Sequence, residues 1–234
     1  RYSLRTGVTD TYNGGAIMSS NEITLAEIFN ENNYKTGIFG KWHLGDNYPS
    51  RPSDQGFQES LIHLSGGIGQ VGDFTNYYKG STSYYDPILW LNNKQEKYNG
   101  YCSDIFTDEA IKFIEDNKDN QFFCYLSFNA PHTPLQVPEK YYQMYKDIDP
   151  TNINGESLEM TEKNILDAKK IYGMVTNIDE NFGKLINKLD ELNLKENTIV
   201  IFMTDNGPQQ PRYVSNLKGL KSQVYNGGIK VPFY

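Results

Sequence analysis

The 234-residue sequence predicts an α/β fold in which helices cover both faces of a largely parallel sheet, giving three layers. Three observations lead to this prediction. Short apolar runs of strand length alternate with longer segments whose apolar residues recur at helical spacing. The runs 121–128 and 199–203 lack polar alternation, which indicates strands buried on both faces. Strands separated by helices are typical of β-α-β units, whose strands run parallel.

The amino-terminal part predicts one helix and one strand. Thr24 is an N-cap residue for a helix that ends near Asn33. A short buried strand follows at 36–39, whereas residues 46–103 are rich in Tyr, Gly, Asn and Ser and predict an irregular insertion. The apolar residues of the helix are expected on one face: Leu25, Ile28 and Phe29.

The remaining elements alternate between helix and strand. A helix starts at Asp104 and leads to the strand at 121–128. Pro138 opens a short helix to about residue 146, because proline suits the first turn of a helix. A long helix at 161–192 precedes the strand at 199–203, the clearest buried strand of the chain.

Composition limits the classes of function. A net charge of −7 argues against a nucleic-acid partner, although a local cluster of cations could still bind an anionic small molecule. No apolar run approaches the length of a membrane span. Cys102 and Cys124 are too few for a disulfide framework, and we expect Cys124 to be a buried free thiol.

The segment 40–45, Gly-Lys-Trp-His-Leu-Gly, leaves the strand at 36–39 with two candidate functional residues. Lys41 and His43 are two apart and point the same way if the chain stays extended. They would then lie at the carboxyl edge of the sheet, where α/β proteins bind ligands. Taken alone, the segment also fits an ordinary loop with a surface lysine and a half-buried histidine.

Two further stretches follow predicted strands. His132 stands between two prolines and could act as a general acid or serve a structural role. Asp205 and Asn206 offer one carboxylate and one amide oxygen, which suit calcium or magnesium better than zinc, although an Asp-Asn-Gly turn explains them equally well.

Taken together, these stretches resemble the formylglycine-dependent sulfatases of the alkaline phosphatase superfamily. Residues 40–45 are similar to a signature of that family, and the opening 1–7 resembles the tail of its Cys-x-Pro-Ser-Arg-x-x-Leu-x-Thr-Gly signature. Three later motifs follow in the family's order: Ala-Pro-His-Thr-Pro at 130–134, Thr-Asp-Asn-Gly at 204–207 and Gly-Leu-Lys at 219–221.

The resemblance implies a role for each matching residue. Lys41 and Lys221 would hold the oxygens of the sulfate, and His132 would protonate the leaving alcohol. The nucleophile would be a formylglycine hydrate upstream of residue 1, braced by Arg1. One of its hydroxyls would attack sulfur, and the second, deprotonated by His43, would expel sulfate and regenerate the aldehyde. Two aspartates of an earlier strand would complete a calcium or magnesium site with the pair Asp205 and Asn206.

The resemblance also sets expectations for the whole chain. Residues 1–234 are expected to be part of an alkaline-phosphatase-like sulfatase catalytic domain, without its first strand, its nucleophile and its carboxyl-terminal region. Such a polypeptide should be inactive by itself. Asn226 and Lys230 depart from the Glu and Arg that are commoner in the motif Glu-Gly-Gly-x-Arg-Val-Pro.

The substrate is expected to be a sulfated carbohydrate or an aryl sulfate. A metal-dependent phosphatase or phosphodiesterase of the same superfamily remains an alternative, as does a protein that binds sulfated glycans without turnover. A dizinc cage is hard to build, because the chain has only His43, His63 and His132. Several aromatic residues between 77 and 101 could stack on sugars, but packing is the favoured role: Tyr77, Tyr78, Tyr84, Tyr85, Trp90, Tyr98 and Tyr101.

Overall fold

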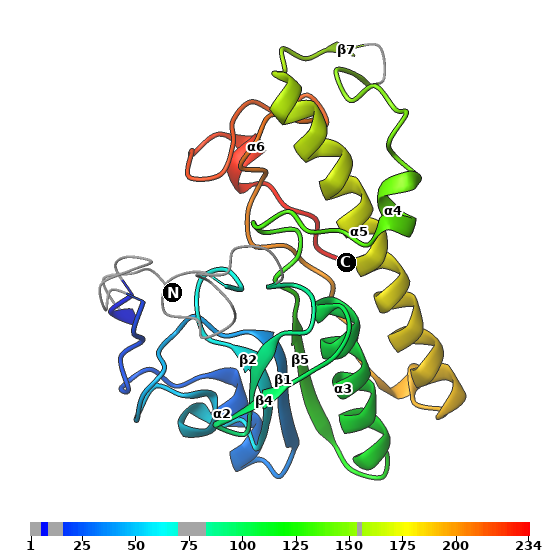
Figure 1. Ribbon diagram of the computed structural model, residues 1–234. Coiled ribbons are helices and arrows are strands. Elements are labelled where there is room, and N and C mark those ends of the chain that lie inside the picture. The colour runs from blue at the N-terminus through cyan, green and yellow to red at the C-terminus, as the bar shows by residue number, and fades with distance from the viewer. Residues whose placement is uncertain (1–5, 9–15, 70–82, 154–155) are drawn as a thin grey trace. The chain divides into compact units, whose positions relative to one another are not determined.

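The computed structural model describes residues 6–8, 16–69, 83–153 and 156–234 (Figure 1). The chain divides into two compact units. The first unit comprises Arg1–Gln136 and Ile178–Leu194, and the second comprises Val137–Asn177 and Lys195–Tyr234. Among the helices of the described ranges, none is long and apolar enough to cross a membrane.

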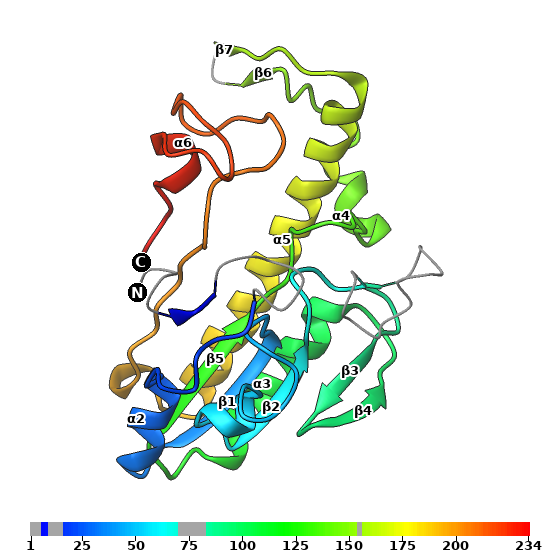
Figure 2. The same ribbon diagram turned by 90° about the vertical axis from the view of Figure 1, so that its left-hand side faces the viewer.

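A five-stranded sheet lies at the centre of the described part of the first unit, in the order β4-β3-β2-β1-β5. The central strand β1 (Lys35–Lys41) runs parallel to both β2 (Glu59–His63) and β5 (Phe122–Ser127). Beyond β2, the antiparallel hairpin of β3 (Ile88–Leu91) and β4 (Lys94–Lys97) extends the sheet (Figure 2). The α/β class is confirmed. The sequence predicts a largely parallel sheet, whereas the observed sheet is mixed, because β3 and β4 pair antiparallel.

The predicted helices form close to their expected positions. They are α2 (Leu25–Glu31), α3 (Cys102–Asp116), α4 (Glu139–Gln143) and α5 (Glu162–Glu191). The side chain of Thr24 caps α2 by accepting a hydrogen bond from the backbone N–H of Glu27, and the Glu27 carboxylate accepts one from the N–H of Thr24. This reciprocal pair of bonds explains why the helix begins where the sequence predicts.

Helices α2 and α3 cover opposite faces of the sheet. Because successive side chains of a strand point to opposite faces, neighbouring residues of β1 separate the two layers. Phe39 faces α3, with its ring centroid 5.6 Å from that of Phe113. Ile38 faces the other way and shares a buried cluster with Ala26 of α2. The three-layer arrangement is therefore confirmed in this unit.

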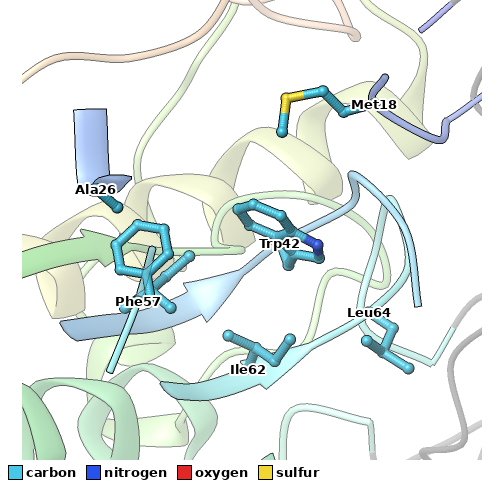
Figure 3. Packing of buried hydrophobic residues seen from close by; sticks show 7 residues of the cluster. Met18, Ala26, Trp42, Phe57, Ile62 and Leu64 are labelled. Atoms are coloured by element: carbon cyan, nitrogen blue, oxygen red, sulfur yellow. The ribbon is translucent and has the colours of Figure 1, made fainter. Parts of the chain in front are cut away.

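The buried cluster on the α2 side surrounds Trp42, which directly follows β1 (Figure 3). The Trp42 side chain is 7% exposed and meets the ring of Phe57 edge-on, at a centroid distance of 6.1 Å. Its indole N–H donates to the carbonyl oxygen of Ser50 at 2.9 Å. The tryptophan between Lys41 and His43 is therefore a fixed core residue that anchors the segment.

Four local predictions are wrong. Leu25 and Ile28 of α2 are 62% and 46% exposed, because Ala26 occupies the side of the helix that packs on the sheet. The segment 46–103 is not irregular throughout, since it contains β2, β3 and β4. The segment 121–128 is not buried on both faces. Within the described sheet, β5 is an edge strand, and Tyr125 is 48% exposed.

The fourth wrong prediction is the strand at 199–203. Ile199 is 90% exposed, and this segment joins no sheet among the described residues. Its only ladder contact there is a bridge between Met203 and Phe233, flanked by two backbone hydrogen bonds of 3.0 Å that join Phe202 and Tyr234. An apolar run becomes a strand only where neighbouring backbone supplies hydrogen bonds, and here that pairing is confined to one bridge.

The second unit contains α4, the amino-terminal half of α5 and the carboxyl-terminal segment with α6 (Asn226–Ile229). A short hairpin of β6 (Asn152–Ile153) and β7 (Glu156–Ser157) precedes α5 (Figure 2). Within this unit the phenol of Tyr145 is 2.6 Å from the hydroxyl oxygen of Thr176, so the turn after α4 is bonded to α5.

Candidate active site

The carboxyl end of β1 carries Lys41 and His43, and the backbone there stays bonded to the neighbouring chain. The N–H of Trp42 donates to the carbonyl oxygen of His63 at 3.2 Å, and that of His43 donates to Leu64 at 3.1 Å. The backbone of His43 has a φ of +55°, in the left-handed region that side chains other than glycine rarely adopt. The extended geometry expected from the sequence therefore ends at His43.

Gly66 lies against the imidazole of His43. A Cβ atom built on Gly66 would come within 2.6 Å of Cε1 of that ring and within 3.1 Å of both ring nitrogens. Gly66 itself is buried and does not adopt a positive φ. Position 66 therefore requires glycine because a side chain would occupy the space of the His43 ring. No pattern in the sequence indicates this requirement.

His63 is the residue that the sequence prediction missed. It is completely buried, lies opposite Lys41 in the parallel register of β1 and β2, and its ring centroid is 6.4 Å from that of Phe106. Burial holds the pKa of His63 well below 6.5, and the nearby charges of Lys41, His43 and His132 lower it further. The predicted Lys41, His43 and His132 are thus close enough to act on one neutral histidine. A prediction of strand β2 from the sequence would have placed His63 at the same sheet edge as Lys41.

The loop that holds His132 turns directly after β5. Both the Ala130–Pro131 and the Thr133–Pro134 peptide bonds are cis. The N–H of His132 donates to the carbonyl oxygen of Asn129 at 2.9 Å, and its Nδ1 lies 2.8 Å from the carbonyl oxygen of Thr133. Because a carbonyl can only accept, Nδ1 carries the proton and Nε2 is the nitrogen whose proton state can change.

Asp205, Asn206 and Lys221 are brought together within the second unit. The N–H of Lys221 donates to the carbonyl oxygen of Pro208 at 2.7 Å, and that of Gly207 donates to Gly228 at 2.9 Å. These two bonds fasten the turn that contains Asp205 and Asn206 to the loop that contains Lys221.

Glycines make this approach of the two loops possible. A Cβ atom on Gly207 would lie 1.8 Å from the carbonyl oxygen of Gly227, so no side chain fits there. Gly227 and Gly228 are themselves buried. The glycine pair of the predicted motif at 226–232 therefore serves close backbone packing, and the departures at Asn226 and Lys230 leave that packing in place.

The same turn tests the expected metal site. The amide of Asn206 donates from Nδ2 to the carbonyl oxygen of Gly207 at 2.8 Å, so its Oδ1 is turned away from that bond. Asp205 is exposed, with one carboxylate oxygen 2.9 Å from the N–H of Asn206. Two hard oxygen ligands fit part of a calcium or magnesium shell. Over the described ranges, no group of three or more His, Cys, Asp or Glu side chains could hold a metal ion.

Two sets of predicted residues remain to be placed. Arg1 lies outside the described residues, as do Tyr77 and Tyr78. Lys41, His43 and His132 lie in the first unit and Asp205, Asn206 and Lys221 in the second, so the single site that the resemblance implies stays a prediction. Packing is confirmed for two of the aromatic residues, because Tyr84 and Tyr101 are buried and stacked at a centroid distance of 5.6 Å.

The open mixed sheet with helices on both faces, with Lys41 and His43 at the carboxyl end of β1, places the protein in the α/β class, whose ligands bind at that edge of the sheet. The sequence profile of the sulfatase family matches residues 1–233. The chain belongs to the sulfatase family.

Individual proteins agree with this assignment. An arylsulfatase of Hemicentrotus pulcherrimus is 29% identical over 92% of this chain and 38% of its own length. An ulvan-active sulfatase of Formosa agariphila is 28% identical over all of this chain and 44% of its own length. The chain thus spans less than half the length of these relatives.

Solved structures show the same fold. The crystal structure of Ps i-CgsB in complex with k-i-k-neocarrahexaose superposes with a TM-score of 0.80 and 30% sequence identity, over all of this chain and 52% of that chain. The alkaline-phosphatase-like class that the sequence predicts is therefore confirmed.

Proposed function

We propose that the protein hydrolyses sulfate esters. The observation that carries this proposal is the placement of Lys41 and His43 at the end of β1, opposite the end of β2, with His132 in the loop after the neighbouring strand β5, in a chain of the sulfatase family. A sulfate monoester carries one negative charge, and charge builds on the bridging oxygen as the sulfur–oxygen bond breaks. Cations for the peripheral oxygens and an acid for the bridging oxygen meet both needs.

Each residue has a distinct task in this proposal. The ammonium groups of Lys41 and Lys221 bind sulfate oxygens and orient the ester. His132 donates the proton on Nε2 to the departing alcohol oxygen, while the bond from Nδ1 to Thr133 keeps the ring in place. His43 would accept a proton from the second hydroxyl of the hydrated aldehyde after the first has taken up the sulfate, so that sulfate is expelled and the aldehyde is regenerated.

A formylglycine residue and a divalent cation complete the proposal. A formylglycine residue upstream of residue 1 would supply the attacking oxygen, and Arg1 would hold it. Asp205 and Asn206 supply two oxygen ligands for calcium, or for magnesium, and the bound cation would supply positive charge next to the sulfate.

A sulfated glycan is the proposed substrate class, with aryl sulfates as model substrates. The ulvan-active relative and the solved complex with a neocarrahexaose are both named for glycans. A phosphatase or phosphodiesterase is the second candidate from the same superfamily. A binder of sulfated glycans without turnover is the third, since the residues described here can hold a sulfate without cleaving it.

The test compares esters in the full-length protein produced together with its formylglycine-forming enzyme. We expect hydrolysis of an aryl sulfate and of a sulfated oligosaccharide, and little hydrolysis of the matching aryl phosphate. His132→Ala should reduce the rate on a sugar sulfate by about 100-fold or more and that on an activated aryl sulfate far less, because a good leaving group needs little protonation.

Each alternative gives a different result. Faster hydrolysis of the phosphate than of the sulfate would favour the phosphatase. Binding of the sulfated oligosaccharide with no turnover in the modified protein would favour the glycan binder. Equal losses on both sulfates in His132→Ala would remove the acid role from His132.

A further inference from the structure

The loop that carries His132 is fastened by a completely buried tyrosine, Tyr84. The Tyr84 hydroxyl donates to the backbone carbonyl oxygen of His132 at 2.8 Å. The same hydroxyl oxygen accepts a hydrogen bond from Nδ2 of Asn129 at 2.6 Å. One hydroxyl group therefore joins the first residue of the turn to the histidine three positions later.

The directions of these bonds follow from the chemistry of the groups. A backbone carbonyl only accepts, so the single hydroxyl hydrogen of Tyr84 points to His132. The side chain of Asn129 must then donate, which fixes the orientation of its amide. With the 2.9 Å bond from the N–H of His132 to the carbonyl oxygen of Asn129, the three residues form a closed set.

Two more bonds hold the far end of the same loop. The backbone N–H of Tyr84 donates to Oε1 of Gln136 at 2.9 Å, and the hydroxyl of Tyr101 donates to the Gln136 carbonyl oxygen at 2.8 Å. The N–H of Cys102 donates to the carbonyl oxygen of Tyr84 at 2.7 Å, which ties Tyr84 to the start of α3. The loop is therefore held against a helix that packs on the central sheet.

Burial makes the Tyr84 hydroxyl a dependable donor. It raises the pKa of Tyr84 well above 10, so the hydroxyl stays protonated at physiological pH. Loss of the hydroxyl would leave the half-buried carbonyl of His132 and the buried amide of Asn129 without this partner. Buried groups that lose a partner tend to move until they find another one.

We propose that Tyr84, together with Asn129, is a positioning residue for His132. It fixes the backbone from which the imidazole projects and so sets where Nε2 meets the leaving oxygen. The hydrogen bond from Tyr84 reaches the backbone carbonyl of His132, so the task that we assign to Tyr84 is positioning and not proton transfer. This inference rests on the proposed acid role of His132, and the experiment below separates the two.

The test is Tyr84→Phe in the full-length, formylglycine-containing enzyme. This change keeps the aromatic ring and removes only the hydroxyl. We expect kcat on a sugar sulfate to fall between about 10- and 100-fold, because small misplacements of a catalytic group have effects of this size. The rate on an activated aryl sulfate should fall by less than about threefold, since that ester needs little protonation.

Tyr98→Phe is the matched control. Tyr98 lies in the same aromatic segment, and among the described residues the influences on its hydroxyl are burial and the charges of Glu109 and Glu96, not a hydrogen bond. The control should leave both rates unchanged.

Asn129→Ser is a second variant, which removes the amide donor and leaves Tyr84 in place. It should show the same selective loss on the sugar sulfate, and it keeps the test open if Tyr84→Phe folds poorly by circular dichroism.

The double variant with His132→Ala separates the inference from the proposed function. If Tyr84 acts through His132, Tyr84→Phe should cause no further selective loss once His132 is alanine. A selective loss that persists in the double variant, or equal losses on both esters in Tyr84→Phe and Asn129→Ser, would overturn the inference. If His132→Ala alone is not selective, the proposed acid role fails instead.

Discussion

Gly66 and His43 are in direct contact, and the contact leaves no room for a methyl group. A Cβ atom on Gly66 would lie 2.6 Å from Cε1 of His43, which is well inside van der Waals contact. The His43 backbone has a φ of +55° and is bonded to Leu64, two residues before Gly66. The His43 ring is therefore held by the conformation of its own backbone and by its contact with Gly66. Four predictions follow from this and other features.

Gly66→Ala should displace the His43 ring while the sheet remains intact. We expect kcat for sulfate ester hydrolysis in the full-length enzyme to fall between about 10- and 100-fold, with a smaller change in KM. Gly183→Ala is the control, because that glycine lies in α5 with nothing within 4 Å of an added Cβ. The control should keep full activity and gain up to about 1 kcal/mol of stability. Full activity of Gly66→Ala would show that the contact does not matter for the reaction.

His63 should make the fold sensitive to acid. Its pKa in the folded chain lies well below 6.5, chiefly through burial, so the unfolded chain binds a proton that the folded chain does not. The stabilisation is complete above pH 6.5 and is lost as the pH falls below that value. The largest slope for one proton is about 1.4 kcal/mol per pH unit.

The measurement is urea unfolding of the wild type and of His63→Gln between about pH 7.5 and pH 5. The glutamine has no proton to gain, so its free energy of unfolding should decline less over this range. Equal declines in the two proteins would assign the acid sensitivity to other groups.

Asp205→Ala should weaken the binding of calcium or magnesium to the full-length enzyme and thereby abolish its activity. The carboxylate is the one charged ligand that this turn offers, and calcium sites depend on such oxygens. Asp147→Ala is the control, since Asp147 is an exposed aspartate in the same unit. Isothermal calorimetry should show weakened cation binding for the first variant alone. Unchanged calcium binding in Asp205→Ala would contradict the proposed metal site.

Residues 1–234 alone are expected not to turn over an aryl sulfate. The two thiols of the chain do not replace the nucleophile. Cys102 is 1% exposed. Cys124 is half-buried, whereas the sequence predicts a buried thiol, and desolvation of its thiol raises the pKa of Cys124 to about 12. A thiol with such a pKa is not ionised at neutral pH and is a poor nucleophile. The assay is multiple turnover of an aryl sulfate by the purified 234-residue chain with calcium. Sustained turnover would show that the nucleophile lies within these residues.

Local chemistry in the sequence determined the helices and the first strand. The Thr24–Glu27 capping box joins residues that are three positions apart. The buried apolar residues of α3, such as Phe106, Ala110 and Phe113, likewise recur at helical spacing. Both features can therefore be recognised in the sequence. The segment 40–45 and the histidine of the loop after β5 were likewise identified from residue type and order. Sequence alone thus identified Lys41, His43 and His132 as neighbours of one sheet edge.

Tertiary pairing decided the rest. The apolar run 199–203 predicts a buried strand, yet Ile199 is exposed because strand formation depends on backbone partners far away in the sequence. His63 carries no motif, and only the register of β1 and β2 places it opposite Lys41. Contacts such as Gly66 against His43 and Tyr84 against His132 join residues that are 23 and 48 positions apart in the sequence. Such contacts depend on where the folded chain brings two surfaces together, and no local pattern encodes that distance.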